Sequence, residues 1–309
     1  MCTKNPVIVI HGGCGKYKED FQEICLLLVK EAALQAYRRS QQGGTALDMV
    51  EEASMFLEND PHFNAGCGAV LNECGEVELD AFIMDGKNLN AGAVAAVRNI
   101  ANPTKLARLI MEQTKHVMLS DRGASRFAKA VGFPEVPMES LITERSRERL
   151  KKNLAAVDSQ IEHETIGAVA LDTAGNVACA TSTGGLSNTL MGRIGDTPCI
   201  GSGGYADNLS GAVSTTGTGE AIMKITLARL ITFNMERGMS PAEAADTGLK
   251  CLWTRLQNTA GVIVVNNAGD WAAKFTTDNM PWAAVAGGKL YYGIALGEVR
   301  TSPIEDICQ

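Results

Sequence analysis

Two stretches in the second half of the chain have the pattern of β-hairpins, and they limit the possible folds more than any other feature. Residues 165–183 run "TIGAVALD", then a turn at "TAGN", then "VACATST". Residues 261–277, "GVIVVNNAGDWAAKFTT", repeat this pattern of apolar, β-branched runs around a glycine turn. Because hairpins join neighbouring antiparallel strands, their frequency argues against a doubly wound parallel sheet. The sequence predicts a layered α+β fold, with antiparallel sheets covered by helices.

The remaining pattern predicts helices and strands around these hairpins. "PVIVIHGGCG" predicts a buried strand that runs into a glycine turn. A helix is expected after Thr45, which would be its N-cap with Asp48 three residues on, and Pro61 closes it. Apolar spacing and capping residues predict further helices at 18–40, 103–114, 220–237 and 240–256, a strand at 92–100, and a hairpin within 63–86 that turns at 72–75.

Residues 139–164, "ESLITERSRERLKKNLAAVDSQIEHE", differ from the sequence on either side. Charges of both signs are dense there, and large apolar residues are sparse. Such a composition is typical of an exposed connection, part of which could be a surface helix. The same segment would also supply slack if the chain were cut after it. Composition alone favours the exposed charged linker and leaves the second reading open.

Charge and composition exclude several classes of function. The net charge is −7, and no basic cluster is dense enough to predict nucleic-acid binding. No apolar run approaches the length of a membrane span. The nine cysteines are scattered without a C-x-x-C pair and no export signal is recognisable, so we expect a cytoplasmic protein with free thiols. The four histidines lack metal-ligand spacing, and no metal-dependent chemistry is expected.

Hydroxyl residues and glycines gather in four short blocks of the second half. Each block lies at a predicted strand end or turn, where a rigid scaffold commonly presents a site. A single threonine in such a position is better explained by its preference for strands, but four blocks together favour a functional site. The blocks are 165–167, 181–185, 192–196 and 214–220.

Thr165 could act as a nucleophile if the chain were cut between Glu164 and Thr165. A threonine at a new N-terminus can use its own α-amine as the base, and that amine titrates near neutral pH. The charged segment before Thr165 would let the old chain end move away. Chance could also place a threonine here, so the pattern by itself leaves both possibilities open.

The ordered motifs resemble those of plant-type L-asparaginases and isoaspartyl peptidases, which are N-terminal nucleophile hydrolases. The resemblance runs from "VIVIHGGCG" through "DPHFNAGCGAVLN", "TIGAVALD", "GRIGDTP" and "TTGTGE" to "MPWAA", and covers all but residues 139–162. It implies a four-layer αββα sandwich in a single domain, 1–309. It also implies self-cleavage into an α chain, 1–164, and a β chain, 165–309, and a homodimer of αβ units. L-Asparagine and β-aspartyl (isoaspartyl) dipeptides are the implied substrates.

The resemblance also implies the roles of particular residues. Thr165 would be the nucleophile, and Thr183 would assist its activation. Thr216 and Gly217 would form the oxyanion hole, and Asn64 would steady the site.

Other matching positions would bind the substrate. Arg193 would hold the α-carboxylate of an aspartyl substrate and Asp196 its α-ammonium group, with Thr218 and Gly219 beside them. Gly12 and Gly13 would shape a loop near the cleavage site, and His11 is expected to be structural rather than catalytic.

Glu164 is the departure from the pattern, since the mammalian relatives have glycine there and the "HDTIG" of glycosylasparaginases has an acid.

No catalytic cofactor is implied, although relatives hold a structural sodium ion on backbone carbonyls that correspond to residues 57–67. Two alternatives remain open: a glycosylasparaginase-like amidase, and an uncleaved, inactive chain with a binding or structural role.

Overall fold

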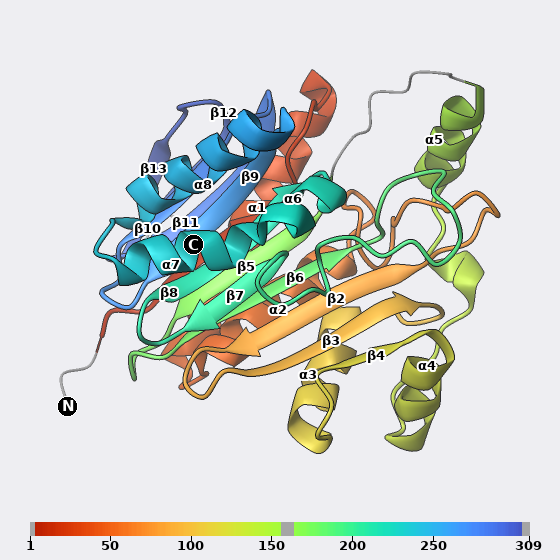
Figure 1. Cartoon of the computed structure of the whole chain (residues 1–309), viewed down its shortest axis with the longest axis horizontal. Coiled ribbons are helices and arrows are strands. Elements are labelled where there is room, and N and C mark those ends of the chain that lie inside the picture. The colour runs from red at the N-terminus through yellow and green to blue at the C-terminus, as the bar shows by residue number, and fades with distance from the viewer. Residues whose placement is uncertain (1–3, 156–163, 305–309) are drawn as a thin grey trace.

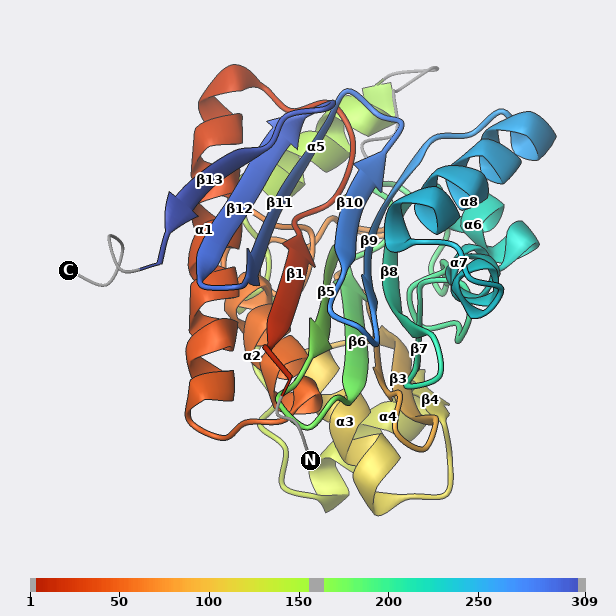
Figure 2. The same ribbon diagram turned by 90° about the vertical axis from the view of Figure 1, so that its left-hand side faces the viewer.

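The computed structural model describes residues 4–155 and 164–304, which form two β-sheets with helices packed on them (Figures 1 and 2). The larger sheet has the strand order β13-β12-β11-β1-β5-β6-β2-β3-β4, and the smaller has the order β10-β9-β8-β7. The strands of the larger sheet are β1 (Val7–His11), β2 (Leu79–Asp85), β3 (Asn90–Val97), β4 (Met118–Ser120), β5 (Ile166–Leu171), β6 (Val177–Thr183), β11 (Asn279–Ala286), β12 (Lys289–Ala295) and β13 (Arg300–Pro303). Those of the smaller sheet are β7 (Gly204–Asp207), β8 (Gly211–Gly217), β9 (Ala260–Asn266) and β10 (Trp271–Phe275).

Both predicted hairpins are confirmed. β5 and β6 pair antiparallel in the larger sheet, and Gly175 takes a φ of +85° in the turn between them. β9 and β10 form the corresponding pair in the smaller sheet. Because β5 also pairs with β1, the strand that follows Thr165 lies in the middle of the larger sheet.

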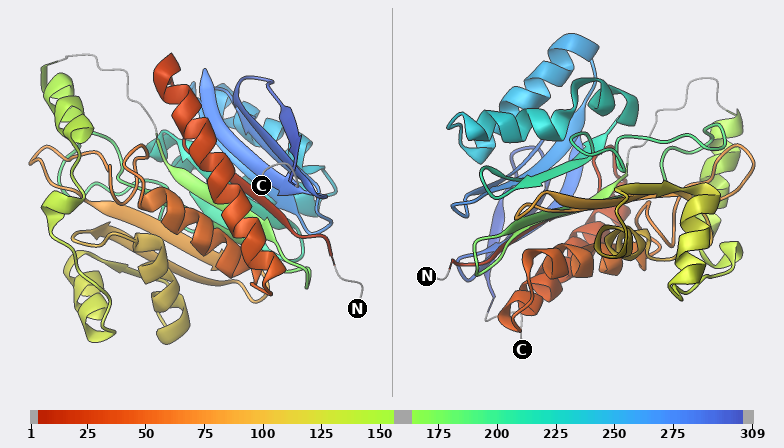
Figure 3. Two further views of the ribbon diagram at one scale, coloured as in Figure 1. Left: turned by 180° about the vertical axis from the view of Figure 1, so that it is seen from behind. Right: turned by 60° about the horizontal axis from the view of Figure 1, so that its bottom comes forward.

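Side chains on the central strands alternate between two apolar cores. Ile8 and Ile10 face the helices, whereas Val7 and Val9 face the smaller sheet, as expected from the two-residue period of a strand. On the outer face of the larger sheet pack α1 (Glu19–Gln41), α2 (Ala46–Glu58) and α3 (Pro103–Gln113). On the outer face of the smaller sheet pack α7 (Leu227–Glu236) and α8 (Pro241–Leu256) (Figure 3). The predicted α+β class is confirmed.

Local capping explains where two of these helices begin. Thr45 caps α2, because the Asp48 backbone N–H donates to Thr45 Oγ1 at 3.3 Å and the Thr45 N–H donates to Asp48 Oδ2 at 2.8 Å. Ser240 makes the same reciprocal pair with Glu243 at the start of α8. These helix starts follow from short sequence signals, and both predictions are confirmed.

The prediction of one helix over 220–237 is wrong, because two helices occupy this range. α6 (Gly219–Ile225) ends at Thr226, whose φ is +49°, and α7 starts at the next residue. The backbone N–H of Arg229 donates to the Gly201 carbonyl at 2.8 Å. The first backbone N–H groups of a helix have no acceptor within that helix. Because the loop at Gly201 supplies an acceptor for one such group of α7, α7 can start as a separate helix.

The predicted hairpin within 63–86 is also wrong in its first half. The turn is present, since the Gly75 N–H donates to the Asn72 carbonyl at 3.0 Å, but residues 63–78 form no strand. The Asn64 side chain accepts the Val70 N–H at 2.9 Å, so side-chain contacts replace a strand ladder here. β2 pairs instead with β6 and β3.

Within the predicted charged linker, the structure contains α5 (Glu144–Ala155), and residues 156–163 lie outside the described part of the chain. A short helix, α4 (Asp121–Ala130), and strands β11 to β13 were not predicted individually. None of the helices in the described residues is long and apolar enough to cross a membrane.

Candidate active site

Thr165 lies directly before β5 and is 7% exposed. Its hydroxyl donates to Thr183 Oγ1 at 3.2 Å, and Thr183 Oγ1 lies 3.4 Å from the Glu164 carbonyl oxygen. The β5–β6 hairpin creates this contact because Ile166 is paired with Ser182, which places the two threonines side by side at one end of the ladder. Two hydroxyls and the carbonyl before Thr165 therefore form a short chain of polar contacts.

The glycine loop after β1 packs directly against the Glu164–Thr165 peptide bond. Gly13 has a φ of +105°, and a Cβ atom on it would lie 2.7 Å from Glu164 Cα and 2.9 Å from the Thr165 nitrogen. A Cβ on Gly12 would lie 2.5 Å from the Phe63 ring. Side chains are thus excluded at both glycines, beside the predicted cleavage site.

Six of the residues predicted to be catalytic or to bind the substrate line one small cavity. It is bounded by the start of β5, the end of β6, the loop over 192–196 and the junction between β8 and α6. The six are Thr165, Thr183, Arg193, Asp196, Gly217 and Gly219. Glu164 lines the same cavity, so the uncut chain itself forms part of the wall.

Two buried carboxyl groups lie beside this cavity. Asp196 is 4% exposed, and its Oδ2 lies 3.0 Å from the Thr215 hydroxyl. Burial raises the pKa of Asp196 to about 6. Asp80 accepts the N–H groups of Ala96 at 2.8 Å and Gly195 at 3.4 Å, and burial raises its pKa to about 7. Asp80 ties β2 to the loop that carries Arg193 and Asp196, and nothing in the apolar run of β2 had indicated this.

Arg193 forms a two-pronged ion pair with Glu220, the second residue of α6. Arg193 Nε and Nη2 each lie 2.9 Å from a Glu220 carboxylate oxygen. The Arg193 side chain is 14% exposed, whereas Glu220 is half-exposed. Glu220 ends the predicted block 214–220, but its pairing with Arg193 was not predicted, because Arg193 was grouped with Asp196.

Three other predicted site residues lie around the cavity. Asn64 Nδ2 donates to the Gly185 carbonyl at 2.8 Å and so holds the loop that follows Thr183. Thr216 is buried, and its Oγ1 accepts the Cys14 N–H at 3.3 Å; Thr218 is the N-cap residue of α6. Neither Thr216 nor Thr218 is among the described residues that line the cavity.

His11 is fully buried between the two sheets, with Nε2 3.0 Å from Ser214 Oγ. Burial lowers its pKa to about 3, so the ring is neutral at physiological pH. A neutral histidine in a buried polar chain is compatible with a structural role, which stays a prediction.

A family model for asparaginase matches residues 4–294. The chain belongs to the asparaginase family. It is 59% identical to the isoaspartyl peptidase/L-asparaginase of Xenopus laevis over 304 residues, covering 97% of this chain and 98% of that protein. It is 54% identical to the protein of the same name from Homo sapiens over 296 residues, which cover 94% of this chain and 96% of the human protein. A probable isoaspartyl peptidase/L-asparaginase of Drosophila melanogaster is 37% identical over 324 residues, covering 96% and 98%.

In this asparaginase-family chain, the side chain before the predicted cleavage site is held by two arginines of α5. Glu164 is 6% exposed, and its carboxylate lies 3.0 Å from Arg145 Nη2 and 3.0 Å from Arg149 Nη1. The composition of residues 139–164 predicted an exposed charged linker with a surface helix in part of it, and it gave no indication of this contact. The spacing of the arginines, four residues apart on a helix, was the available signal.

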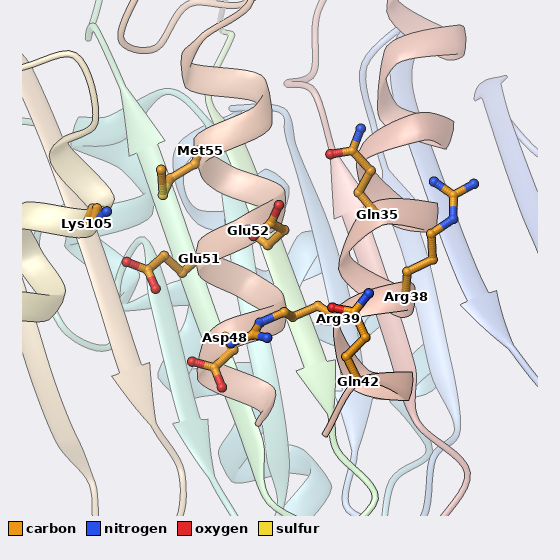
Figure 4. A pocket seen from close by; sticks show the side chains of 9 residues that line it. All are labelled: Gln35, Arg38, Arg39, Gln42, Asp48, Glu51, Glu52, Met55 and Lys105. Atoms are coloured by element: carbon orange, nitrogen blue, oxygen red, sulfur yellow. The ribbon is translucent and has the colours of Figure 1, made fainter. Parts of the chain in front are cut away.

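A larger hollow of about 520 Å³ lies between α1, α2 and α3, on the outer face of the larger sheet (Figure 4). Its lining is mainly charged and polar, and it contains no residue of the predicted site. Among the described residues, no group of three or more His, Cys, Asp or Glu side chains is arranged to hold a metal ion. The cavity at Thr165 is the candidate active site of this family member, because the predicted catalytic and substrate-binding residues line it.

Proposed function

We propose that this chain hydrolyses L-asparagine and β-aspartyl dipeptides and releases L-aspartate, with Thr165 as an N-terminal nucleophile. Relatives more than 50% identical over nearly their full length are named isoaspartyl peptidase/L-asparaginase. The observation that carries the assignment is the placement of the Thr165 hydroxyl 3.2 Å from Thr183, in a cavity that Arg193 and Asp196 also line.

Self-cleavage comes first in this proposal. Thr165 Oγ attacks the carbonyl carbon of Glu164, and the hydroxyl proton passes to the Thr165 nitrogen as the C–N bond breaks. An ester between Glu164 and Thr165 Oγ results. Water hydrolyses this ester to the Glu164 carboxylate and the free Thr165 hydroxyl. The products are chains 1–164 and 165–309, and the new α-amine of Thr165 is the base for catalysis.

The substrate is then held by its α-carbon substituents. The guanidinium of Arg193 binds the α-carboxylate, and the Asp196 carboxylate binds the α-ammonium group, with Thr218 and Gly219 at this end of the site. This leaves the β-carbonyl facing Thr165, so one site accepts both asparagine and β-aspartyl dipeptides.

Thr165 Oγ adds to the β-carbonyl, and the Thr216 hydroxyl and Gly217 N–H stabilise the oxyanion. Loss of one such donor typically slows a reaction about 10²- to 10³-fold. Ammonia or an amino acid leaves with the proton taken from Thr165, and water releases aspartate from the acyl-enzyme. Thr183 and Asn64 support this geometry, Thr183 through the nucleophile and Asn64 through the loop at Gly185.

The wider organisation follows the same proposal. Helices pack outside two facing sheets, which supports the four-layer αββα sandwich of N-terminal nucleophile hydrolases. We also propose a homodimer of αβ units in the cytoplasm.

A structural sodium ion is proposed at residues 57–67, because a Cβ on Gly68 would lie 2.6 Å from the Pro61 carbonyl oxygen and 2.8 Å from that of Phe63. Converging carbonyl oxygens suit a hard cation.

The test measures release of L-aspartate by the purified protein from L-asparagine and from a β-aspartyl dipeptide. We expect activity on both substrates, loss of activity in Thr165→Ala, and residual activity in Thr165→Ser, which keeps a hydroxyl nucleophile. Undiminished hydrolysis by Thr165→Ala would refute the assigned nucleophile. An inactive, uncut wild-type chain would favour a binding or structural role.

A further inference from the structure

The Glu164 side chain is anchored more firmly than a residue of an exposed linker would be. Its carboxylate is within hydrogen-bond distance of Arg145 Nη2 through both oxygens, at 3.0 and 3.3 Å, and of Arg149 Nη1 at 3.0 Å. The Glu164 side chain is 7% exposed and that of Arg149 is 12% exposed. Charge-assisted hydrogen bonds in a buried setting are stronger than surface ion pairs.

Arg145 is itself held in place from two other directions. Arg145 Nη1 donates to the His62 carbonyl at 2.8 Å, and its guanidinium lies 4.0 Å from the centre of the Phe21 ring. Arg145 and Arg149 lie four residues apart, on one face of α5. The arginine pair therefore connects Glu164 to α1, to the loop at residue 62 and to α5.

The charge around Glu164 is predominantly positive. A hollow of about 310 Å³ beside it is lined by Lys16, Lys18 and Lys152 in addition to the two arginines, with Glu148 as the other acidic residue in its lining. A buried carboxylate without partners is strongly unfavourable, so the two arginines in contact with Glu164 determine where its side chain can lie.

We propose that Arg145 and Arg149 are positioning residues for self-cleavage, which they promote by holding Glu164 so that its carbonyl carbon faces Thr165 Oγ. This inference rests on the proposed function, since it concerns the same self-cleavage step. Gly13 packs against the backbone on one side, Thr183 contacts the Glu164 carbonyl, and the arginine pair fixes the side chain.

Loss of Arg149 removes one of the two cations that hold Glu164 and leaves Arg145 as its partner. The Glu164 side chain then shifts toward Arg145, and its carbonyl carbon moves relative to Thr165. A displacement of about 1 Å in such an arrangement can cost about 10²-fold in rate. We expect Arg149→Ala to slow self-cleavage about tenfold or more. Arg149→Lys keeps the charge and can offer one nitrogen to Glu164 in place of Arg149 Nη1, so it should cut faster than Arg149→Ala.

The experiment follows full-length chain synthesised in a cell-free system under a pulse of labelled amino acid. The fraction remaining uncut is measured on denaturing gels over time. The variants are Arg149→Ala, Arg149→Lys, Glu164→Gln and the double variant Arg149→Ala with Glu164→Gln. Arg147→Ala is the matched control, because Arg147 lies on the same helix and pairs with the exposed Glu139 instead.

If the arginines act through Glu164, Glu164→Gln slows cleavage, and adding Arg149→Ala to it changes the rate by less than about threefold. The control Arg147→Ala cuts at the wild-type rate. Cleavage of Arg149→Ala at the wild-type rate overturns the inference, and so does an equal slowing in the Glu164→Gln background. Failure of the wild-type chain to cut at all instead overturns the proposed function.

Discussion

Replacement of Arg193 by alanine should separate substrate binding from self-cleavage. Arg193 is 14% exposed and is already oriented by two 2.9 Å contacts with Glu220, so little ordering is needed when a substrate carboxylate binds. Truncating one partner of a buried charge pair typically costs about 2–5 kcal/mol, which is about 30-fold to several thousandfold. We expect kcat/KM for L-asparagine to fall by about 10²-fold or more, within that range.

The assay compares L-asparagine with 3-aminopropanamide, the same amide without the α-carboxylate. The wild-type enzyme should prefer asparagine by about the factor that Arg193→Ala loses, and the variant should show almost no preference. Self-cleavage of Arg193→Ala at the normal rate provides the control for folding. A variant that still prefers asparagine as strongly as the wild type would refute the carboxylate-binding role. Loss of self-cleavage would instead assign Arg193 to folding.

Three further perturbations test other parts of the structure. Asp196 must be ionised to bind the substrate ammonium group, and its pKa is about 6. As the pH decreases, log kcat/KM should begin to fall near the pKa of the Thr165 amine, at about 7.7. Protonation of Asp196 should make this fall steeper below about pH 6. Asp196→Asn should remove that steeper part, and an unchanged profile would contradict the assignment. Gly13→Ala should slow self-cleavage on a gel time course, because its Cβ would lie 2.7 Å from the backbone of the residue before the cut. Gly43→Ala, whose φ of +84° is equally unfavourable but which faces open space, should cut normally. Ser240→Ala removes the cap of α8 and should lower stability by about 1 kcal/mol, or a Tm decrease of about 2 °C by calorimetry. An unchanged Tm would mean that this cap contributes little.

Features fixed by neighbouring residues were predictable from the sequence. The β5–β6 hairpin follows from two β-branched runs around Gly175, and the start of α2 follows from Thr45 with Asp48. The site residues that line the cavity were also predicted, because they belong to hydroxyl and glycine blocks at strand ends and turns. A rigid scaffold commonly presents a site at such positions.

Features that depend on contacts between distant segments were missed. α6 and α7 break at Thr226 because the loop at residue 201 supplies a hydrogen-bond acceptor, and no local signal reports that. Glu220 and Asp80 looked like ordinary members of a helix and a strand, since their partners are set by tertiary packing. The same holds for Glu164 and the arginines of α5, which the charge density of the linker concealed.

The most direct test of the central claim is the intact mass of the purified protein. The account predicts two chains, 1–164 and 165–309, whose masses sum to that of the full chain plus one water, and a single uncut chain for Thr165→Ala. A wild-type protein that persists as one full-length species on incubation, or that is cut at a different bond, would contradict it.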